Sequence, residues 1–483
     1  MRVVMAASEA VPFAKTGGLA DVVGALPRAL KRLGVDVSVV LPAYRSISGE
    51  RFNVQRTSRT LQVPLSKETV SAGVLQTEME GGIPVYLIEA DQYFGRTGLY
   101  GTPDGDFLDN AARFAFFARA VPALCQQLGA PDVVHCHDWQ SALIPVFLRA
   151  DAARYPELAN LRTVLTIHNL GYQGLFWHFD WHLLNIDWRY FAPEYLEFYG
   201  RINYLKGGIV CDDAITTVSP TYAKEIQTPE FGCGLEGVLV GRRQALTGIL
   251  NGVDYDEWSP TQDRFIAARY SAADLDGKAR CKADLQTTVG LPVEADVPLI
   301  GIVSRLADQK GFDLLAQIAP HLLRKRLQIV VLGSGDAKHQ ELFQELAQHS
   351  KKHLAVRIAF DNALAHKIEA GSDMFLMPSR YEPCGLNQIY SLRYGTIPIV
   401  RSTGGLEDTI TDFDPQSARG TGFKFSEYAP EALLACIERA LHAYKQPALW
   451  RPLIANAMQA DFSWDRSAEA YVGLYRKLCG ASR

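Results

Sequence analysis

The feature that most constrains the fold is a regular alternation of short apolar runs with helical segments. The apolar runs span residues 2–8, 35–42, 131–138, 163–169, 214–219, 297–304, 327–335, 374–379 and 397–403. Several are followed by segments with apolar residues at three- and four-residue spacing, such as 19–34 and 311–325. Strands that are apolar on both faces and alternate with helices form parallel sheets covered on both sides. The alternation therefore predicts an α/β protein.

The length and one weak region of the pattern predict two domains. A chain of 483 residues exceeds the roughly 250–300 residues that a single core supports. Between 253 and 297 the pattern gives way to sequence rich in Asp, Ser, Ala and Pro. We therefore predict an N-terminal domain over 1–255 and a C-terminal domain over 256–483. A last helical pattern at 463–480 could pack on either half.

One stretch departs from the alternation of strand and helix. Residues 66–90 carry alternating apolar residues on both sides of Glu80, Gly81 and Gly82. This pattern is typical of a β-hairpin, so an antiparallel excursion is expected here.

Charge and cysteine usage exclude several classes of protein. The formal net charge of −4 provides no diffuse positive field, so neither nucleic acid nor an anionic membrane is expected as a partner. No apolar run approaches the roughly 18 residues that cross a bilayer, and the opening strand pattern does not resemble a secretion signal. The closest of the eight cysteines, Cys125 and Cys136, lie eleven residues apart, which excludes CxxC redox and zinc spacings. We expect a cytoplasmic protein.

The motif Thr-Gly-Gly-Leu-x-Asp occurs twice, at 16–21 and 403–408, each time between an apolar run and a helical pattern. Such turns lie at the carboxyl edge of a parallel sheet, where ligands bind. The paired glycines are Gly17, Gly18, Gly404 and Gly405. Their backbone N–H groups can approach an anion, and a helix N-terminus adds positive charge. Lys15 adds a cation to the first turn, whereas Ser402 stands at the corresponding position of the second. For both turns, the alternative of a plain strand-to-helix connection without a ligand is also possible.

Neither turn matches a known nucleotide fingerprint. A Walker loop needs GxxxxGK followed by Ser or Thr, which both copies lack. Residues 333–338 begin like GxGxxG but have Lys338 in place of the last glycine, so a nicotinamide oxidoreductase is a weak competitor. A plain turn and a role against a sugar or phosphate are both open for 333–338.

Metal-binding patterns are weak. DxD occurs at Asp104/Asp106, Asp254/Asp256, Asp274/Asp276 and Asp412/Asp414, and none follows a clear buried strand. His135 and His137 have no third ligand in register, so packing is the better interpretation. We expect no metal.

Six blocks of sequence identify a family resemblance. They are residues 15–27, 135–143, 166–174, 249–258, 304–315 and 379–409. In this order and over nearly the whole length, the chain resembles bacterial glycogen synthases and plant starch synthases. The resemblance implies a GT-B-type α/β fold, with two Rossmann-like doubly wound domains facing across a deep interdomain cleft. The N-terminal half would be the starch-synthase catalytic domain on the acceptor side, and the C-terminal half the nucleotide-sugar side.

The activity that the resemblance implies is elongation of an α-1,4-glucan. Glucose would pass from ADP-glucose to the nonreducing end of the glucan or a maltooligosaccharide, with retention and without a metal. ADP-glucose is then a substrate, and no cofactor is expected. UDP-glucose or another donor stays open, as does a catalytically silent glucan-binding or priming partner. Intact Lys15, Arg305, Lys310 and Glu382 argue against the silent form.

The catalytic residues implied by the resemblance are His168, Arg305, Lys310 and Glu382. Arg305 and Lys310, on a loop before a helix, would stabilise charge on a diphosphate leaving group. Glu382 could bond sugar hydroxyls or stabilise an oxocarbenium-like transition state. In related transferases this glutamate opens an E-x7-E pattern, whereas Tyr390 stands at the second place here.

A further set would bind the donor. It comprises Lys15, Gly17, Gly18, Asp21, Asp138, Asn251, Phe360, Cys384, Gly385, Leu386, Thr403, Gly404 and Gly405. Phe360 stands where a ring would stack on adenine, with a core phenylalanine as the open alternative. Residues 172–204 contain twelve aromatics, which suit either a glucan surface or a packed core, and they stay outside the predicted site.

Overall fold

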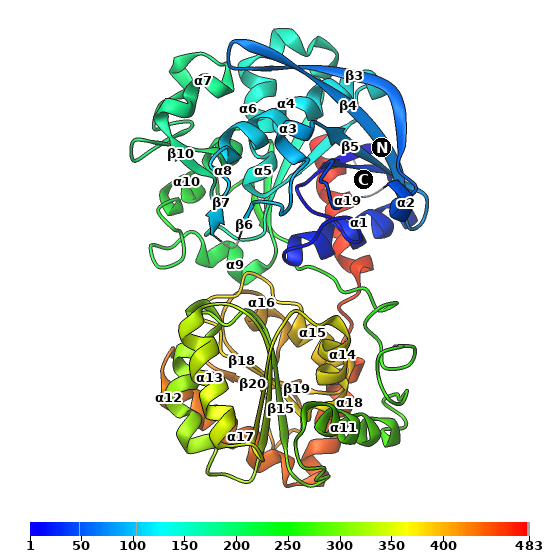
Figure 1. Ribbon diagram of the computed structural model, residues 1–483, viewed down its shortest axis with the longest axis vertical. Helices are drawn as coiled ribbons and strands as arrows, with labels where there is room; N and C mark the ends of the chain where they lie inside the picture. The colour runs from blue at the N-terminus through cyan, green and yellow to red at the C-terminus, as the bar shows by residue number, and fades with distance from the viewer. Residues whose placement is uncertain (48, 103, 481–483) are drawn as a thin grey trace. The chain divides into compact units, whose positions relative to one another are not determined.

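The computed structural model describes residues 1–47, 49–102 and 104–480 (Figure 1), so the last three residues of the predicted C-terminal domain lie outside it. The chain forms two compact units. Unit 1 contains Met1–Gly252 and the chain from Trp464 onward, and unit 2 contains Val253–Ser463. Among the described helices, none is both long and apolar enough to cross a membrane.

Unit 1 is built on a nine-stranded sheet with the order β14-β13-β9-β8-β1-β2-β5-β4-β3. Its strands are β1 (Arg2–Ala6), β2 (Asp36–Pro42), β3 (Gln55–Leu65), β4 (Glu68–Met79), β5 (Ile83–Glu89), β8 (Val133–His137), β9 (Arg162–Ile167), β13 (Ala214–Thr217) and β14 (Leu246–Gly248). All pairs are parallel except β4 with β5 and β3 with β4. The predicted hairpin is confirmed, since Met79 pairs with Ile83 across the 80–82 turn.

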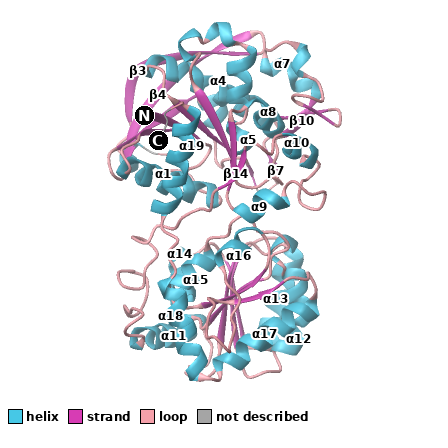
Figure 2. Ribbon diagram, turned by 180° about the vertical axis from the view of Figure 1, so that it is seen from behind, coloured by secondary structure: helices cyan, strands magenta, loops and turns pink. Residues whose placement is uncertain are grey.

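Helices cover this sheet on both sides (Figure 2). They are α1 (Gly18–Arg32), α2 (Gly49–Phe52), α3 (Asp91–Phe94), α4 (Asn110–Leu128), α5 (Asp138–Ser141), α6 (Leu143–Ala150), α7 (Trp181–Leu184), α8 (Tyr204–Cys211), α9 (Pro220–Glu225), α10 (Glu236–Gly241) and α19 (Trp464–Leu478). Two small sheets complete the unit: β6 (Gly101–Thr102) with β7 (Gly105–Asp106), and β10 (Leu175–Trp177), β12 (Arg201–Asn203) and β11 (Glu197–Phe198) in that spatial order.

The last helix, α19, packs in unit 1 beside α1, as Figure 1 shows by the red helix next to the blue one. Tyr471 and Tyr475 on α19 are fully buried. The Tyr475 hydroxyl lies 2.8 Å from Nδ1 of His135. The sequence pattern left the packing partner of this helix open because its apolar stripe carries no information about which surface will cover it.

Unit 2 has a six-stranded, wholly parallel sheet with the order β17-β16-β15-β18-β19-β20. Its strands are β15 (Leu299–Val303), β16 (Gln328–Gly333), β17 (Leu354–Ile358), β18 (Met374–Met377), β19 (Ile397–Arg401) and β20 (Phe423–Phe425). Its helices are α11 (Asp276–Val289), α12 (Phe312–Leu322), α13 (Ala337–His349), α14 (Asn362–Gly371), α15 (Asn387–Arg393), α16 (Gly404–Thr409), α17 (Pro430–Tyr444) and α18 (Pro447–Gln459).

Both faces of the unit 2 sheet are buried, as the apolar runs predict. Ile300 and Ile302 belong to one core cluster, whereas Leu299 belongs to the other. Successive side chains of a strand point to opposite faces, so this division puts apolar helices on both sides. The prediction of parallel sheets covered on both faces is confirmed.

In each sheet the strand order reverses at one place. In unit 1 the chain runs from β1 to β2 on one side and later continues with β8 on the other side of β1. In unit 2 it runs from β15 to β16 and β17, and then continues with β18 on the other side of β15. Ligands of open α/β sheets bind in the crevice that such a reversal leaves at the carboxyl ends. These two places are therefore where a site is expected.

Candidate functional site

In unit 2 the residues predicted to be catalytic flank the strand-order reversal. Arg305 and Lys310 follow β15, and Glu382 follows the adjacent strand β18. Two neighbouring parallel strands thus bring together side chains that are more than seventy residues apart in sequence.

Lys310 and Glu382 form a largely buried ion pair. The Lys310 Nζ lies 2.9 Å from Oε1 and 2.7 Å from Oε2 of Glu382. The Ser379 hydroxyl donates to Oε2 of the same carboxylate at 2.9 Å. Only 19% of the Lys310 side chain and 7% of the Glu382 side chain are exposed. A cation and a carboxylate are thus held side by side at the sheet edge, in surroundings where charge interactions are strong.

Arg305 is the exposed member of this group. One of its guanidinium nitrogens donates to Oε1 of Gln309 at 3.1 Å, within the same loop. Because guanidinium stays charged and offers a planar fork of donors, Arg305 is suited to bind an anion from the solvent side.

The turn at 403–405 packs directly on the backbone of Glu382 and Pro383. The Gly405 amide donates to the backbone oxygens of Glu382 at 3.1 Å and Pro383 at 3.2 Å. Gly404 has a φ of +45°, and a Cβ added there would lie 1.9 Å from the Glu382 carbonyl oxygen. Glycine is required here because any side chain would displace the backbone of Glu382.

This packing corrects one expectation about the 403–405 turn. Its backbone N–H groups were expected to face a phosphate. The Thr403 amide instead donates to the Arg401 carbonyl oxygen at 3.0 Å, and the Gly405 amide is used as described above. Those two amides are satisfied inside the protein, so the turn serves first to hold Glu382 in place.

The turn formed by Cys384, Gly385 and Leu386 leads into α15. Cys384 is buried, and its carbonyl oxygen and that of Gly385 accept from Nε2 of Gln388 at 3.0 and 3.1 Å. Gly385 has a φ of +70°. The carbonyls of this turn are thereby held toward α15.

Phe360 follows the edge strand β17 and is 86% exposed. The alternative of a core phenylalanine is therefore wrong. An open ring face at the carboxyl end of the sheet is compatible with stacking on a base.

The turn at 333–338 is explained by packing. The Leu306 amide donates to the Ser334 carbonyl oxygen at 3.0 Å, and the Asp336 amide donates to that of Leu306 at 2.8 Å. A Cβ on Gly333 would lie 1.8 Å from the Ser304 carbonyl oxygen. Its glycines thus allow two loops to approach closely, which favours the plain turn.

In unit 1 the predicted residues flank the reversal in the same way. Lys15 and Asp21 follow β1, Asp138 follows β8, and His168 follows β9. Lys15 Nζ lies 2.6 Å from Oδ1 of Asp21. Burial raises the pKa of Asp21, and the charge of Lys15 acts against that rise. The cation expected beside the first glycine turn is therefore held by a carboxylate of the same turn.

A carboxylate of the protein itself accepts hydrogen bonds from the first glycine turn. Glu9, a buried residue, accepts from the amide and hydroxyl of Thr16 and from the Gly17 amide at 3.3 Å. The Tyr100 hydroxyl donates to the same carboxylate at 2.6 Å. The expectation that the glycine amides of this turn lie open to a phosphate is thus corrected for Gly17. Gly18 begins α1 immediately after this turn.

Asp138 has an unusual backbone and an unusual environment. Its φ is +55°, a region that few residues other than glycine adopt and that is often found at functional sites. It is 9% exposed, and Oδ1 accepts from the His168 amide at 2.7 Å. Burial raises its pKa to about 7, against the hydrogen bonds from the amides of His168 and Asn169. Its carboxyl group can therefore gain or lose a proton near neutral pH.

His168 contacts a second histidine. Its Nε2 lies 3.0 Å from Nδ1 of His137. Burial lowers the pKa of His168 to about 3, so its imidazole is neutral at pH 7. A neutral imidazole beside a reacting group can donate or accept one hydrogen bond without bringing a charge.

His135 takes part in packing, as predicted for the His135–His137 pair. Besides Tyr475, its ring contacts Thr166, with Nε2 2.6 Å from the hydroxyl oxygen. The two histidine rings lie 4.2 Å apart between centroids. In the described ranges, no group of three or more His, Cys, Asp or Glu residues is arranged to hold a metal ion.

Asn251 follows β14 at the end of unit 1 and is 6% exposed. Its Oδ1 is buried and has no hydrogen-bond partner among the residues that the structure describes. Because an unpaired buried acceptor is unfavourable, this atom is available to a ligand hydroxyl.

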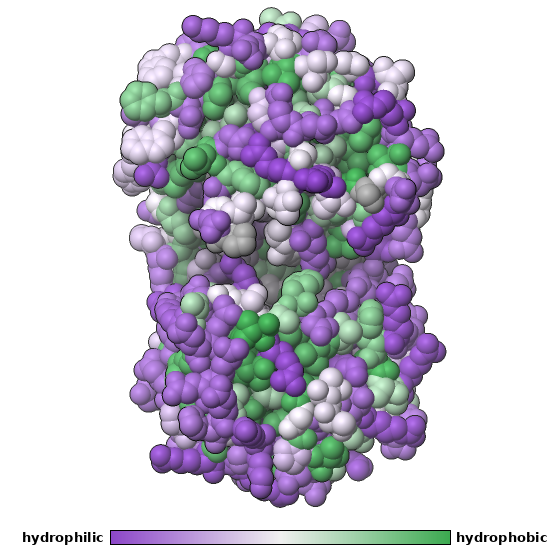
Figure 3. All heavy atoms as spheres, viewed as in Figure 1, coloured by the Kyte–Doolittle hydropathy of each residue, from purple (hydrophilic) through white to green (hydrophobic). Residues whose placement is uncertain are grey.

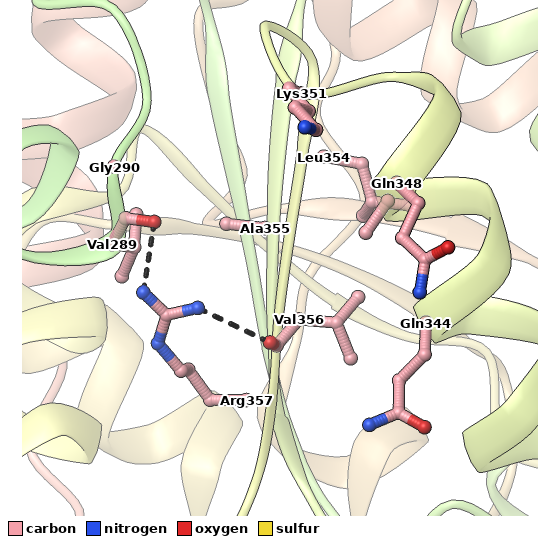
Figure 4. Close-up of a pocket in the computed structure, with 10 residues that line it drawn as sticks. Val289, Gly290, Gln344, Gln348, Lys351, Leu354, Ala355, Val356 and Arg357 are labelled. Carbon is pink, nitrogen blue, oxygen red and sulfur yellow. Dashed lines mark hydrogen bonds between the residues drawn. The ribbon is translucent and has the colours of Figure 1, made fainter.

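A separate hollow of about 460 Å³ lies beside the edge strand β17 (Figure 4). It is lined by Val289, Gly290, Gln344, Ala347, Gln348, Lys351, Leu354, Ala355, Val356 and Arg357. The Arg357 guanidinium reaches across it to the Val289 carbonyl oxygen at 3.0 Å, as Figure 4 shows. None of the predicted site residues lines this hollow.

Two contributing residues, Glu9 and Ser379, escaped the sequence analysis, and a third, His137, was assigned there to packing. Glu9 directly follows the apolar run at 2–8, and an acid among mostly apolar residues before the glycine turn could have indicated a buried carboxylate. Ser379, beside Glu382, and His137, beside His168, have no such signal because their roles depend on side-chain geometry.

Two family models match the chain. The one described as the starch synthase catalytic domain matches residues 2–241, and the one described as glycosyl transferases group 1 matches residues 290–453. A glycogen synthase from Koribacter versatilis is 54% identical over 477 residues, covering 99% of this chain and 98% of the relative. Glycogen synthase 2 from Geobacter sulfurreducens is 47% identical over 484 residues, covering 100% of both.

Solved structures agree with these matches. The catalytic domain of starch synthase IV from Arabidopsis thaliana, bound to ADP and acarbose, superimposes with a TM-score of 0.91 at 35% identity and covers 99% of both chains. Sucrose-phosphate synthase from Thermosynechococcus elongatus gives a TM-score of 0.61 at 19% identity over 100% of both chains, which supports the fold alone. The fold of the two units is that of GT-B glycosyltransferases.

Proposed function

We propose that this chain, which belongs to the glycogen synthase family, elongates an α-1,4-glucan with glucose from ADP-glucose. Transfer would go to the nonreducing end with retention at the anomeric carbon. No metal ion and no cofactor would take part.

The observation that carries this proposal is the group formed by Arg305, Lys310 and Glu382. Transfer from a nucleotide sugar places charge on a diphosphate leaving group, and two cations at the carboxyl ends of the strands can stabilise it. The carboxylate paired with Lys310 would lie beside the sugar attached to that diphosphate, and it can accept hydroxyl hydrogen bonds. The ADP bound to the Arabidopsis starch synthase supports an adenine nucleotide as the donor.

The remaining predicted residues of unit 2 would complete the donor site. Phe360 would stack on the base through its exposed ring face. The turns at 384–386 and 403–405 would hold Glu382 in position, since Gly405 bonds its backbone.

The unit 1 residues would act on the sugar and the acceptor. We propose that His168 and Asp138 bond hydroxyl groups at the reacting centre, and that Asn251 offers its unpaired Oδ1 to another. Lys15 would add a cation to the donor phosphates, with Asp21 orienting it. The Gly17 and Gly18 turn would bring the N-terminal end of α1 close to them.

The proposed reaction needs no external base to take up the proton of the acceptor hydroxyl. The bond between glucose C1 and the distal phosphate oxygen breaks, and a bond forms between C1 and O4 of the acceptor on the same face. The proton of the acceptor hydroxyl passes to the leaving phosphate oxygen. Arg305 and Lys310 would stabilise the resulting charge, in place of a metal ion.

We also propose the cytoplasm as the location. All eight cysteines are free thiols, which is typical of reducing compartments.

The test supplies labelled ADP-glucose and labelled UDP-glucose separately, each with a maltooligosaccharide acceptor, and follows chain growth with and without a chelator. Incorporation from ADP-glucose that survives the chelator supports the proposal. Faster incorporation from UDP-glucose would show that UDP-glucose, and not ADP-glucose, is the donor. Incorporation from neither nucleotide sugar would favour a silent glucan-binding partner.

Variants tie the activity to the residues. Lys310→Ala and Glu382→Ala are each expected to lower turnover by about a hundredfold or more. Lys338→Ala is the matched control, because this exposed lysine also pairs with a carboxylate, Asp308, on the same side of the sheet. Near-normal turnover in either site variant, or an equal loss in the control, would contradict the assignment of Lys310 and Glu382 to the active site.

A further inference from the structure

Exposed large hydrophobic side chains gather in one short stretch of unit 1. Of the twelve such side chains in the described ranges, six lie between residues 172 and 199. They are Tyr172, Leu175, Trp177, Phe179, Trp188 and Tyr199. On the face drawn in Figure 3, pale and green side chains lie over the region of α7 and β10. A concentration of this kind marks a binding surface more often than a solvated one.

The three-stranded sheet β10-β12-β11 orders part of this surface. Trp177 on β10 is paired with Arg201 on β12, which is paired with Phe198 on β11. Residues paired across strands point to the same face, so these three side chains form one row. The Arg201 guanidinium lies 5.7 Å from the centroid of the Trp177 ring, and Trp177 is 62% exposed.

The opposite face of this sheet is anchored in the core. Phe176 lies 5.7 Å from Trp139 and 4.7 Å from Tyr204 between ring centroids. Ile202 on the same face is fully buried. Trp139 directly follows Asp138, so the sheet is packed against the residue next to the proposed site.

The turn between β11 and β12 provides independent support for a binding role. Tyr199 has a φ of +49° and Gly200 a φ of +76°. Two positive φ values are typical of a two-residue hairpin turn, whose first position suits Asn or Asp and disfavours a bulky side chain. Tyr199 is nevertheless 84% exposed, so burial does not offset the strain. Strain of this kind is often found at functional positions.

We propose that the row Trp177, Arg201 and Phe198, with Tyr199 and Phe179 beside it, is a platform that binds an α-glucan chain away from the reacting end. This inference rests on the proposed function. A pyranose ring presents a flat face of C–H groups that packs on an aromatic ring, and Arg201 offers forked donors to adjacent hydroxyls. The platform would retain a polymeric acceptor between additions.

The test uses the full chain with Trp177→Ala and Tyr199→Asn, singly and together. Asparagine tolerates the positive φ of position 199, so Tyr199→Asn removes the ring while keeping or raising stability. Leu108→Ala is the control, because Leu108 is a fully exposed apolar side chain of unit 1 outside the platform. The readouts are direct binding to glycogen and the ratio of KM for glycogen to KM for maltotriose.

Glycogen binding of the double variant is expected to weaken roughly tenfold, and the KM ratio to rise by a similar factor. Leu108→Ala should change neither. Unchanged glycogen binding in the double variant overturns the platform. A change of oligomeric state in light scattering with an unchanged KM ratio overturns it too, since the patch would then join copies of the chain. If the unmodified chain incorporates no glucose, the proposed function fails, whereas loss of glycogen binding in the variants still tests the platform.

The contacts between His137 and His168 support a separate inference. Both rings are neutral at pH 7, because burial lowers the pKa of each. Between His137 Nδ1 and His168 Nε2, one nitrogen must therefore donate and the other accept. The second nitrogen of His137, Nε2, is buried and has no partner among the described residues. Orphaned buried N–H groups are rarer than orphaned acceptors, so the proton belongs on Nδ1 of His137.

We infer that His137 is a positioning residue that makes Nε2 of His168 an acceptor and leaves the His168 proton on Nδ1, toward the substrate. This inference rests on the proposed role of His168. In the opposite tautomer, His168 would present a bare lone pair to the sugar and could not donate to it.

Nitrogen-15 NMR of labelled histidines measures the tautomer directly, with the His168 signals identified by their loss in His168→Ala. Protonation at Nδ1 in the unmodified chain supports the inference, and protonation at Nε2 overturns it. For turnover, His137→Asn keeps an amide donor near the position of Nδ1, whereas His137→Ala does not. The expected kcat falls roughly tenfold or more in His137→Ala with little change in KM for ADP-glucose, and recovers partly in His137→Asn. Equal kcat losses in the two variants would also overturn the inference.

Discussion

Replacing Asp138 by asparagine should stabilise the protein and stop its proposed reaction. Asparagine has nearly the same shape, tolerates a φ of +55°, and keeps an oxygen that accepts the His168 amide. The substitution therefore removes little except the ionisable carboxyl group.

The size of the effect follows from the pKa of Asp138. Burial raises this pKa from 3.8 to about 7. Below pH 3.8 the carboxyl is protonated in both the folded and the unfolded chain, so it contributes no difference. Between pH 3.8 and 7 the unfolded chain loses the proton while the folded chain keeps it, and stability falls as the pH rises. Above pH 7 the full penalty is present, about 4 kcal/mol at 1.36 kcal/mol per pKa unit.

The amide of the Asp138→Asn variant does not titrate and carries no such penalty at any pH. The variant should therefore unfold at a higher urea concentration and temperature than the parent at pH 8, by about 8–16 °C at roughly 2–4 °C per kcal/mol. The difference should shrink toward zero as the pH falls below 3.8, where Asp138 is protonated in both the folded and the unfolded chain. Asp36→Asn is the control, because it replaces an exposed carboxyl of the same unit and relieves no burial penalty.

The assay compares unfolding midpoints at pH 5 and pH 8, together with turnover on ADP-glucose. Turnover of Asp138→Asn should fall by roughly a hundredfold, since the carboxylate no longer bonds the sugar. A variant that is less stable at pH 8, or equally stabilised at both pH values, would refute the argument from burial. Normal turnover would refute the placement of Asp138 at the reacting centre.

Four shorter predictions follow from the glycine turns and the two ion pairs. Gly404→Ala should destabilise unit 2 by about 3 kcal/mol, since the new Cβ meets the Glu382 carbonyl oxygen at 1.9 Å. Gly17→Ala should leave thermal unfolding unchanged, because its φ is −155° and no described atom lies within 4 Å of the added Cβ. Lys15→Ala should raise KM for ADP-glucose roughly tenfold in steady-state kinetics, and an unchanged KM would exclude it from the donor site. Glu382→Gln should bind ADP more tightly in calorimetry, by about 1 kcal/mol, because the charge that offsets Lys310 is gone; weaker binding would contradict the pairing.

The site residues were predictable to the extent that they follow strands. Arg305, Lys310 and Glu382 lie just after apolar runs, and the carboxyl ends of parallel strands meet at one edge, but their catalytic roles were implied by the family resemblance. The sequence indicated Phe360 as a candidate for stacking on the base, but it did not predict that the ring is exposed. A phenylalanine after a strand is compatible with both core and surface.

The glycine turns show where such reasoning stops. The two copies of Thr-Gly-Gly look equivalent in sequence, yet Glu9 caps the first and the Glu382 backbone packs against the second. An amide predicted to bind phosphate can be satisfied by any nearby acceptor, and that acceptor is set by packing.

What the sequence determined by itself was local: the period of its apolar residues specified strands, helices and parallel sheets, and the glycines after two apolar runs indicated turns at strand ends. The site residues came from the family resemblance of six sequence blocks. What only the tertiary structure decided was non-local. Strand order placed β18 beside β15 and so joined Lys310 to Glu382, and packing assigned α19 to unit 1. Burial gave Asp138 its raised pKa. These properties depend on which segments surround a residue, and the linear pattern of a chain does not record its neighbours in space.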